Sequence, residues 1–197
     1  MDALTYEGFN RDIDRLFSVG DLIDRGPESE KCLTLLREPW FFMVRGNHED
    51  MLINACGGDG ESYNWWSSYG AWAKSIENDE MENWAKLFRS FPVAITLEAG
   101  ACSVGICHAE PDGQDWEMMR NHPDSTGVML WGRRVLRNPP DYNVEGVDFT
   151  VHGHTPLDQP AWVGNRYFMD TGAGHGQKLT LRKIDDIWAE YQLRQIL

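Results

Sequence analysis

Two short apolar runs, each followed at once by a cluster of polar residues, constrain the fold of this chain more than any other feature. The first run covers residues 15–20 and leads into Asp21, and the second covers residues 40–44 and leads into the polar cluster 45–49. Between them, residues 29–37 carry apolar side chains at helical spacing. This order predicts a βαβ unit with parallel strands. Ligands in such sheets bind at the carboxyl ends of the strands, where both polar clusters fall.

The rest of the chain divides into a helical part and a strand-rich part. Residues 50–90 are expected to be mostly helical, with a break at the glycine-rich stretch 57–60. After Pro92, a hairpin is expected from residues 93–97 and 101–107, turned at 98–100. Further strands are expected at 147–151, 167–169, 179–181 and 187–193. We therefore expect a single α/β domain over residues 1–197, with two sheets and helices outside them.

The net charge of the chain limits the classes of molecule that it is expected to bind. The formal net charge of −13 repels nucleic acid phosphates and anionic lipid, so we expect neither as a partner. No uncharged apolar run approaches the roughly 20 residues that span a bilayer, and the first residues lack the regions of a signal peptide. The cysteines show no CxxC pair and are interpreted as reduced core residues, which favours a cytoplasmic location.

Several aromatic and imidazole side chains are given structural roles. Four tryptophans of the helical part are interpreted as core packing in preference to a substrate-stacking surface: Trp65, Trp66, Trp72 and Trp84. His152 is expected to be structural or to support a ligand, and Asp170 to close a turn beside the site. His122 and His175 lie in loop-like segments and are expected at the surface.

Polar side chains that follow the expected strands make up one chemically coherent set. They are Asp21, Asp24, Asn47, His48, His108, His154 and Asp170. Carboxylate, carboxamide and imidazole groups without thiolates suit Mn, Fe or Zn in a catalytic site. The neighbouring Arg25 and Arg45 supply planar donors that match phosphate oxygens. Taken singly, the aspartates also fit turn or helix-cap roles and the histidines also fit a core, but the combination favours hydrolysis of a phosphate ester.

At these positions the sequence resembles the serine/threonine phosphoprotein phosphatases of the small bacterial and lambda-phage type, within the metallophosphoesterases. The motifs that carry the resemblance are residues 20–26 (GDLIDRG), 45–49 (RGNHE), 107–109 (CHA), 153–156 (GHTP) and 170–173 (DTGA). The resemblance implies an α/β/β/α sandwich of two mixed sheets. Asp21 is then a metal-bridging ligand, and Asn47, His108 and His154 complete the second metal position.

The resemblance also assigns the groups that handle the substrate. His48 is then the general acid that protonates the leaving alkoxide, and Asp24 fixes its tautomer. Arg25 and Arg45 hold the phosphate. Arg133 matches a further phosphate arginine of the family more loosely, because the residues on either side of it depart from the family pattern.

The start of the chain departs from the family. These enzymes open with a strand that ends in GDxHG, whose Asp and His hold the first metal, and this sequence begins inside the helix that follows it. The expectation is therefore that the domain is incomplete at its N-terminus and lacks the first strand. We expect it to bind one divalent metal, Mn in preference to Fe or Zn, where the family binds two.

The reaction implied is direct attack on phosphorus by a metal-bound hydroxide, without a phosphoenzyme. The expected substrate is a phosphorylated protein or peptide, or a small phosphate ester. Two alternatives stay open. One is an impaired or non-catalytic one-metal remnant that binds phosphate or a phosphoprotein, and the other is a hydrolase of dinucleoside polyphosphates from the same superfamily.

Overall fold

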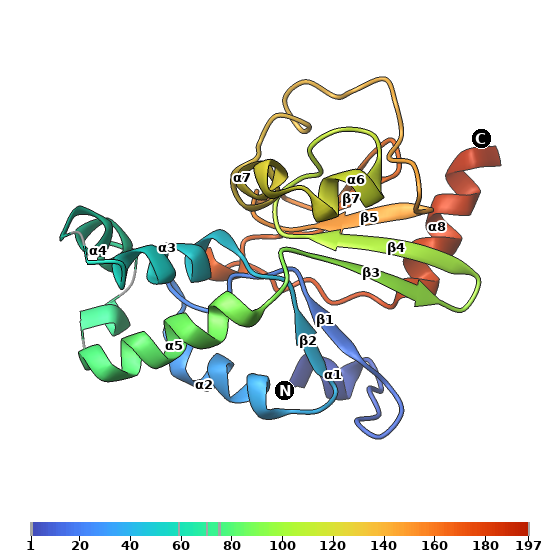
Figure 1. Ribbon diagram of the computed structural model, residues 1–197. Coiled ribbons are helices and arrows are strands. Elements are labelled where there is room, and N and C mark those ends of the chain that lie inside the picture. The colour runs from blue at the N-terminus through green and yellow to red at the C-terminus, as the bar shows by residue number, and fades with distance from the viewer. Residues whose placement is uncertain (1, 59, 70, 75, 197) are drawn as a thin grey trace.

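The computed structural model describes residues 2–58, 60–69, 71–74 and 76–196. Within these residues it shows a two-stranded parallel sheet and a five-stranded mixed sheet, with helices packed outside them (Figure 1). The expected architecture of two sheets enclosed by helices is confirmed.

The smaller sheet contains the βαβ unit expected from the sequence. Strand β1 (Leu16–Ser18) pairs in parallel with β2 (Phe41–Met43). The connection between them contains α2 (Ser29–Leu33) and the short η1 (Thr34–Arg37). Helix α1 (Asp2–Tyr6) precedes β1. The parallel pairing brings the carboxyl ends of β1 and β2 to the same edge of the sheet.

The helical part follows β2 and has its own apolar core. It contains α3 (Asn47–Ala55), α4 (Gly60–Ser67), η2 (Ala71–Lys74) and α5 (Asn78–Ser90). The buried side chains of this core include Trp66, with α3, α4 and α5 contributing most of the others. The packing role expected of the tryptophans therefore holds for Trp66, and Trp72 and Trp84 pack against the same core while partly buried. It does not hold for Trp65, which is 48% exposed.

The larger sheet has the strand order β3-β4-β5-β7-β6. Its strands are β3 (Ala94–Ala99), β4 (Cys102–Cys107), β5 (Phe149–His152), β6 (Ala161–Val163) and β7 (Arg166–Phe168). The β3–β4 hairpin turns later than expected, because Ala99 pairs with Cys102 and leaves two residues in the turn. Gly100 takes φ +61° there, which a glycine adopts without strain.

Two expectations for the C-terminal part were wrong, and one strand was missed. Residues 179–181 form no strand, and residues 187–193 lie within the helix α8 (Ile184–Ile196). Ile184, Ile187 and Trp188 follow helical spacing and pack against the larger sheet, so the helical period decides the structure. Strand β6, which the sequence analysis did not identify, pairs with β7.

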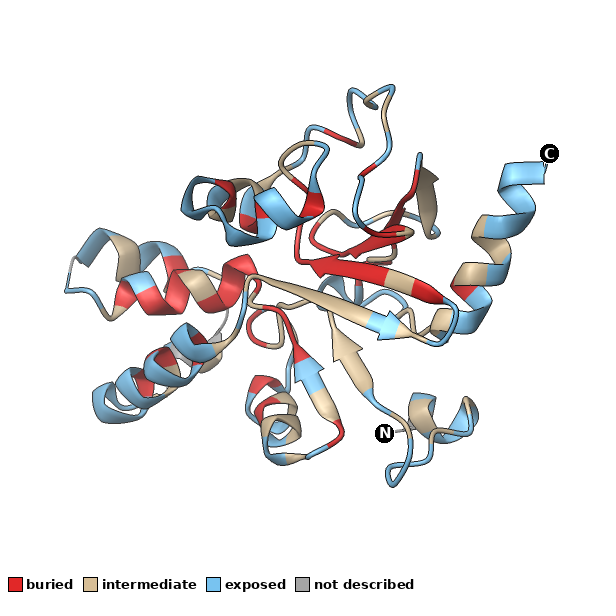
Figure 2. Ribbon diagram, turned by 45° about the vertical axis from the view of Figure 1, so that its right-hand side comes forward, coloured by how far each residue is buried: buried red, intermediate tan, exposed pale blue. Residues whose placement is uncertain are grey.

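The two faces of the larger sheet are covered by different elements. One face packs against α8 and the smaller sheet, through a cluster that includes Val104, Phe149 and Ile187. The other face packs against α6 (Trp116–Asn121) and α7 (Thr126–Trp131), which η3 (Pro123–Ser125) joins. Buried residues are concentrated in β4, β5 and α3 (Figure 2).

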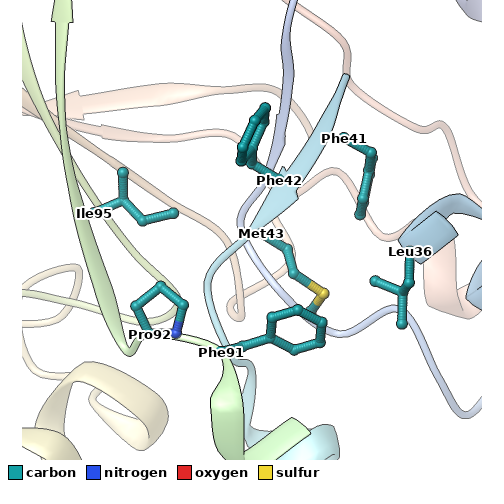
Figure 3. A pocket seen from close by; sticks show the side chains of 7 residues that line it. All are labelled: Leu36, Phe41, Phe42, Met43, Phe91, Pro92 and Ile95. Atoms are coloured by element: carbon teal, nitrogen blue, oxygen red, sulfur yellow. The ribbon is translucent and has the colours of Figure 1, made fainter. Parts of the chain in front are cut away.

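An apolar pocket lies beside β2. Its lining comes from η1, β2, β3 and the two residues that follow α5, and consists of Leu36, Phe41, Phe42, Met43, Phe91, Pro92 and Ile95 (Figure 3). Because no ionisable side chain lines this pocket, it does not offer acid–base or metal chemistry. Among the described residues, no helix has the length and apolar composition needed to cross a bilayer.

Candidate functional site

Four side chains that the sequence analysis selected converge on one point. Asp21 follows β1, Asn47 begins α3, His108 follows β4 and His154 follows β5. Asn47 Oδ1 lies 2.8 Å from His108 Nε2 and 2.9 Å from His154 Nδ1. His108 Nε2 lies 3.1 Å from His154 Nδ1 and 3.4 Å from Asp21 Oδ1. Residues from both sheets thus meet at the start of α3 (Figure 1).

The chemistry of these atoms fits a divalent cation. The Nδ1–H group of His108 donates to the carbonyl oxygen of Val19 at 2.6 Å, so in the neutral imidazole Nε2 carries the lone pair and faces the other three residues. Burial lowers the pKa of His108, but the charge and hydrogen bond of Asp21 outweigh it and raise that pKa, so His108 carries a proton on Nε2 more readily when no cation is bound. A carboxamide oxygen and a carboxylate oxygen are acceptors as well. Lone pairs held this close repel one another, and a cation among them relieves that repulsion. The candidate ligand atoms of Asp21, His108 and His154 all lie within 4.8 Å of one another.

Burial and neighbouring charges shift the pKa values of the side chains that meet at this point. Burial raises the pKa of Asp21, but the charge and hydrogen bond of His108, followed by the charge of His48, outweigh it and hold that pKa well below its usual range. Burial lowers the pKa of His154 to about 3, and the charge of His108 adds to this effect. His154 is therefore neutral near pH 7, the form in which an imidazole binds a metal.

His48 and Asp24 form a second, adjacent unit. His48 Nδ1 lies 2.7 Å from Asp24 Oδ2. Among the described residues His48 Nε2 has no hydrogen-bond partner although it is buried, and it lies 3.9 Å from Asp21 Oδ2. The free ring nitrogen thus points to the same region as the candidate metal ligands.

Asp24 is held by two tryptophans that the sequence analysis had assigned to packing alone. Trp66 Nε1 donates to Asp24 Oδ2 at 3.1 Å, and Trp72 Nε1 donates to Asp24 Oδ1 at 2.6 Å. Together with His48, they give the buried carboxylate a partner on each oxygen. The only sequence signal for this role is the general need of a buried indole N–H for an acceptor.

Glu49, to which the sequence analysis gave no role, ties two loops together. Its carboxylate accepts from the backbone N–H groups of Gly46 at 2.8 Å, Asp21 at 3.0 Å and Leu22 at 2.8 Å. Burial, followed by the charge of Asp21, raises the pKa of Glu49 to about 6. A glutamate three residues after the helix N-cap Gly46 is a capping signal that the sequence does carry.

Two glycines permit the close approach of the loops that follow β1 and β2. A Cβ atom on Gly46 would lie 2.2 Å from Asp21 Oδ1. A Cβ atom on Gly20, which has φ +96°, would lie 2.7 Å from the Cα atom of Gly46. Neither position has room for a side chain, so the placement of Asp21 depends on both glycines.

The backbone of the site is strained at the candidate residues themselves. The non-glycine residues with positive φ are Asp21 (57°), Asp24 (72°), Arg25 (55°) and His154 (66°), within the described part of the chain. Such left-handed conformations cost of order 1 kcal/mol or more each and persist where the surroundings enforce them. All four belong to the set selected from the sequence.

The three candidate phosphate-binding arginines differ in their surroundings. Arg25 is exposed, and its guanidinium lies over the ring of Tyr69, 5.3 Å from the centroid. Arg133 is also exposed, and its charge contributes to the lowered pKa of His154. Arg45 is half-buried, and its Nε lies 3.8 Å from Asp50 Oδ1. Arg25 thus lies beside Tyr69 and Arg133 lies near enough to His154 for its charge to act there, while Arg45 lies beside Asp50 of α3.

Comparison with known proteins decides the family. Residues 3–158 match the family described as Calcineurin-like phosphoesterase. The chain belongs to this family. It is 34% identical over 179 residues to serine/threonine-protein phosphatase 1 of Salmonella typhimurium, which covers 89% of this chain and 81% of that protein. It is also 34% identical to serine/threonine-protein phosphatase 2 of Escherichia coli, over 87% of this chain and 80% of that protein.

Some relatives of lower sequence identity are named as tetraphosphatases. The phosphoesterase is 26% identical over 187 residues to a bis(5'-nucleosyl)-tetraphosphatase of Anoxybacillus flavithermus, over 88% of this chain and 76% of that protein. In fold it resembles a crystal structure of a candidate diadenosine tetraphosphatase, with a TM-score of 0.64, 22% identity and coverage of 89% and 78% of the two chains. The expected resemblance to bacterial serine/threonine phosphatases is confirmed, and the chain is a phosphoester hydrolase with a metallophosphoesterase fold.

The other histidines of the phosphoesterase and Asp170 lie outside the group of converging side chains. His152 is buried, and its Nε2 lies 2.7 Å from Thr150 Oγ1. Asp170 accepts the N–H of Gly172 in a turn at 2.8 Å, before η4 (Ala173–His175). His122 and His175 are exposed, as expected.

Proposed function

We propose that this phosphoesterase hydrolyses phosphate monoesters in a single step at the point where Asp21, Asn47, His108 and His154 meet. The observation that carries the proposal is the buried, unpartnered Nε2 atom of His48, 3.9 Å from Asp21 Oδ2 among the described residues. A nitrogen that can hold a proton there is suited to protonating a leaving oxygen.

One divalent ion is proposed for the four converging side chains, whose nitrogen and oxygen donors suit Mn, Fe or Zn. Among these we propose Mn, which the resemblance to the bacterial phosphatases implies. When bound, such an ion neutralises charge on the phosphoryl group and activates water for attack. Asp21, Asn47, His108 and His154 then hold and orient it. The four free cysteines, Cys32, Cys56, Cys102 and Cys107, support a reducing compartment, and we propose the cytoplasm.

His48 and Asp24 act as a unit in this proposal. The Asp24 carboxylate accepts from Nδ1 of His48 at 2.7 Å, which leaves the proton to be transferred on Nε2. As the ester bond breaks, that proton passes from Nε2 to the leaving alkoxide, and Asp24 stabilises the imidazolium before transfer. The arginines Arg25, Arg45 and Arg133 are proposed to bind the phosphate oxygens.

The proposed substrate is a phosphorylated protein or peptide, or a small phosphate ester, in keeping with the relatives that are 34% identical. A dinucleoside polyphosphate is the second candidate. The observation in its favour is the group of exposed arginines just after α7, Arg133, Arg134 and Arg137, which offers positive charge for a longer phosphate chain.

The test compares metal content and hydrolysis in matched histidine variants. The chain loaded with Mn is expected to retain about one ion after dialysis and to hydrolyse 4-nitrophenyl phosphate and a phosphoserine peptide. His154→Asn is expected to lose both properties, whereas His122→Asn, at an exposed position, keeps them. Full metal retention and activity in His154→Asn would contradict the proposed site. Diadenosine tetraphosphate, tested alongside, decides between the two substrate candidates.

A further inference from the structure

An unbroken arc of aromatic rings borders the candidate site. Each ring contacts the next, with centroid distances of 5.1 Å for His48–Tyr69, 5.9 Å for Tyr69–Trp65, 5.4 Å for Trp65–Trp131, 6.3 Å for Trp131–His154 and 4.9 Å for His154–His108. The two ends of the arc are residues of the candidate catalytic set. Its middle is formed by Trp65, Tyr69 and Trp131, which have no part in the proposed chemistry.

Two of the three middle rings are exposed to solvent, and the third, Tyr69, is half-buried. Trp65 is 48% exposed and Trp131 is 37% exposed, whereas the neighbouring Trp66 is fully buried. Trp65 comes from α4 and Trp131 from the end of α7, and their rings stack at an interplanar angle of 21°. Exposed tryptophan is uncommon, because burial of its large apolar surface is favourable. Two such rings, stacked beside a catalytic site, form a surface suited to binding.

The arc is continuous with the groups that would hold the phosphate. The guanidinium of Arg25 lies 5.3 Å from the centroid of the Tyr69 ring, and the backbone N–H of Arg25 donates to the carbonyl oxygen of Tyr69 at 3.0 Å. Tyr69 also contacts the ring of His48, which faces the leaving oxygen in the proposed reaction. A group attached to that oxygen therefore extends toward Tyr69 and the tryptophans beyond it.

We propose that Trp65, Tyr69 and Trp131 form an aromatic subsite that binds a planar ring carried by the phosphate ester. This inference rests on the proposed function, since it assigns the substrate class of the same site. Stacking on an exposed indole is tolerant of ring identity, so the ring is either a nucleobase or an aryl group. A ring bonded directly to the ester oxygen lies nearest Tyr69, and a ring separated by a ribose lies nearer Trp65 and Trp131.

Two pairs of esters isolate the contribution of the ring. Adenosine 5'-monophosphate and ribose 5-phosphate differ by the base, and phenyl phosphate and ethyl phosphate differ by the aryl ring. Dissociation constants are measured by calorimetry on the Mn-loaded His48→Asn variant, in which turnover is slowed, and kcat/KM is measured on the Mn-loaded wild-type chain. We expect the ring-bearing member of at least one pair to bind about 10-fold more tightly. The pair that shows the difference identifies the source of the ring.

The double variant Trp65→Leu/Trp131→Leu keeps apolar bulk but removes both indole faces. It is expected to reduce the ring-dependent ratio to about 1, with less than a 2-fold change for ribose 5-phosphate and ethyl phosphate. The matched control is Phe42→Leu. Phe42 is 42% exposed and stacks on Phe17 at 5.2 Å and 21°, but it lies on β2 beside the apolar pocket. The control is expected to keep the ratio.

Equal binding of both members in both pairs, or a ratio that survives in the double variant, overturns the aromatic subsite. A ratio lost equally in Phe42→Leu overturns it as well. Because binding is measured independently of turnover, the comparison holds whether or not the esters are cleaved. A chain that hydrolyses none of the four esters contradicts the proposed function, whereas equal hydrolysis and binding of all four contradicts the subsite alone.

Discussion

Trp72 donates its indole N–H to the Asp24 carboxylate across 2.6 Å, and the other oxygen of that carboxylate lies 2.7 Å from Nδ1 of His48. Through these contacts the helical part of the chain positions the candidate general acid. Trp72 acts on the proposed reaction through Asp24 and His48. It is therefore a positioning residue.

Trp72→Phe keeps an aromatic ring and removes the N–H donor. A hydrogen bond to a charged group contributes about 1.5 kcal/mol or more, so we expect kcat for alkyl phosphates to fall about 10-fold. The fall is expected to be smaller for 4-nitrophenyl phosphate, because its leaving group needs little protonation. Trp84→Phe is the control, since the Trp84 indole lies 3.4 Å from the exposed Glu80 instead. An equal fall on both ester types would assign Trp72 a purely structural role.

His48→Asn removes the proposed general acid but no candidate metal ligand. We expect kcat for alkyl phosphates to fall by about 10²- to 10⁴-fold, while the metal content stays nearly unchanged. The loss is expected to shrink for aryl phosphates. Steady-state kinetics on both ester types, with metal analysis of the same samples, checks this. Equal losses on aryl and alkyl esters would remove His48 from the acid role.

Gly46→Ala tests the close approach of the two loops. The added methyl group would meet Asp21 Oδ1 at 2.2 Å, so Asp21 must move. We expect a loss of about 1–3 kcal/mol in the free energy of unfolding, as for an overpacked core, together with weaker Mn binding. Gly127→Ala is the control, because its Cβ would meet nothing within 4 Å and it lies within α7. That variant is expected to match or exceed the wild type in stability. Unchanged Mn affinity in Gly46→Ala would show that Asp21 tolerates the shift.

The buried His152 makes stability depend on pH. Burial lowers the pKa of His152 to about 3 in the folded chain, against 6.5 for a free histidine. Between these values the unfolded chain binds a proton that the folded chain does not, so stability is present above pH 6.5 and is lost as the pH falls. Uptake of one such proton changes the free energy of unfolding by about 1.4 kcal/mol per pH unit.

His152→Gln removes the side chain that takes up this proton in the unfolded chain. Between pH 6 and pH 4, the slope of the free energy of unfolding against pH is therefore expected to be smaller than in the wild type by about 1.4 kcal/mol per pH unit. Urea unfolding with a chelator present measures the slope. His122→Gln, at an exposed position, is expected to keep the wild-type slope. A slope unchanged in His152→Gln would assign the acid sensitivity to other groups.

The parts of the fold that were predictable from the sequence are those encoded locally. The runs before Asp21 and Asn47 are short, apolar and bounded by polar loops, and both proved to be parallel strands. The strand expected at residues 187–193 is wrong because Ile184, Ile187 and Trp188 repeat at helical spacing, as the packed side of α8 requires.

In the candidate site, too, the residues within local motifs were predictable and the contacts between distant segments were not. Its imidazole and carboxylate residues could be selected because each follows a strand in a recognisable motif. The donors that hold Asp24 could not, because Trp66 and Trp72 reach it from 42 and 48 residues away in the chain. Such contacts depend on how the helices pack against the loop after β1, which no local pattern specifies.

The left-handed backbone at Asp21, Asp24, Arg25 and His154 sets a limit on engineering this enzyme for heat resistance. Glycine adopts that conformation without steric strain, so replacing these residues by glycine is a route by which a stabilising screen could gain melting temperature. Each such gain would remove a side chain on which the proposed reaction depends. A library selected for thermostability alone would therefore accumulate inactive proteins, and these four positions should be held fixed in any such design.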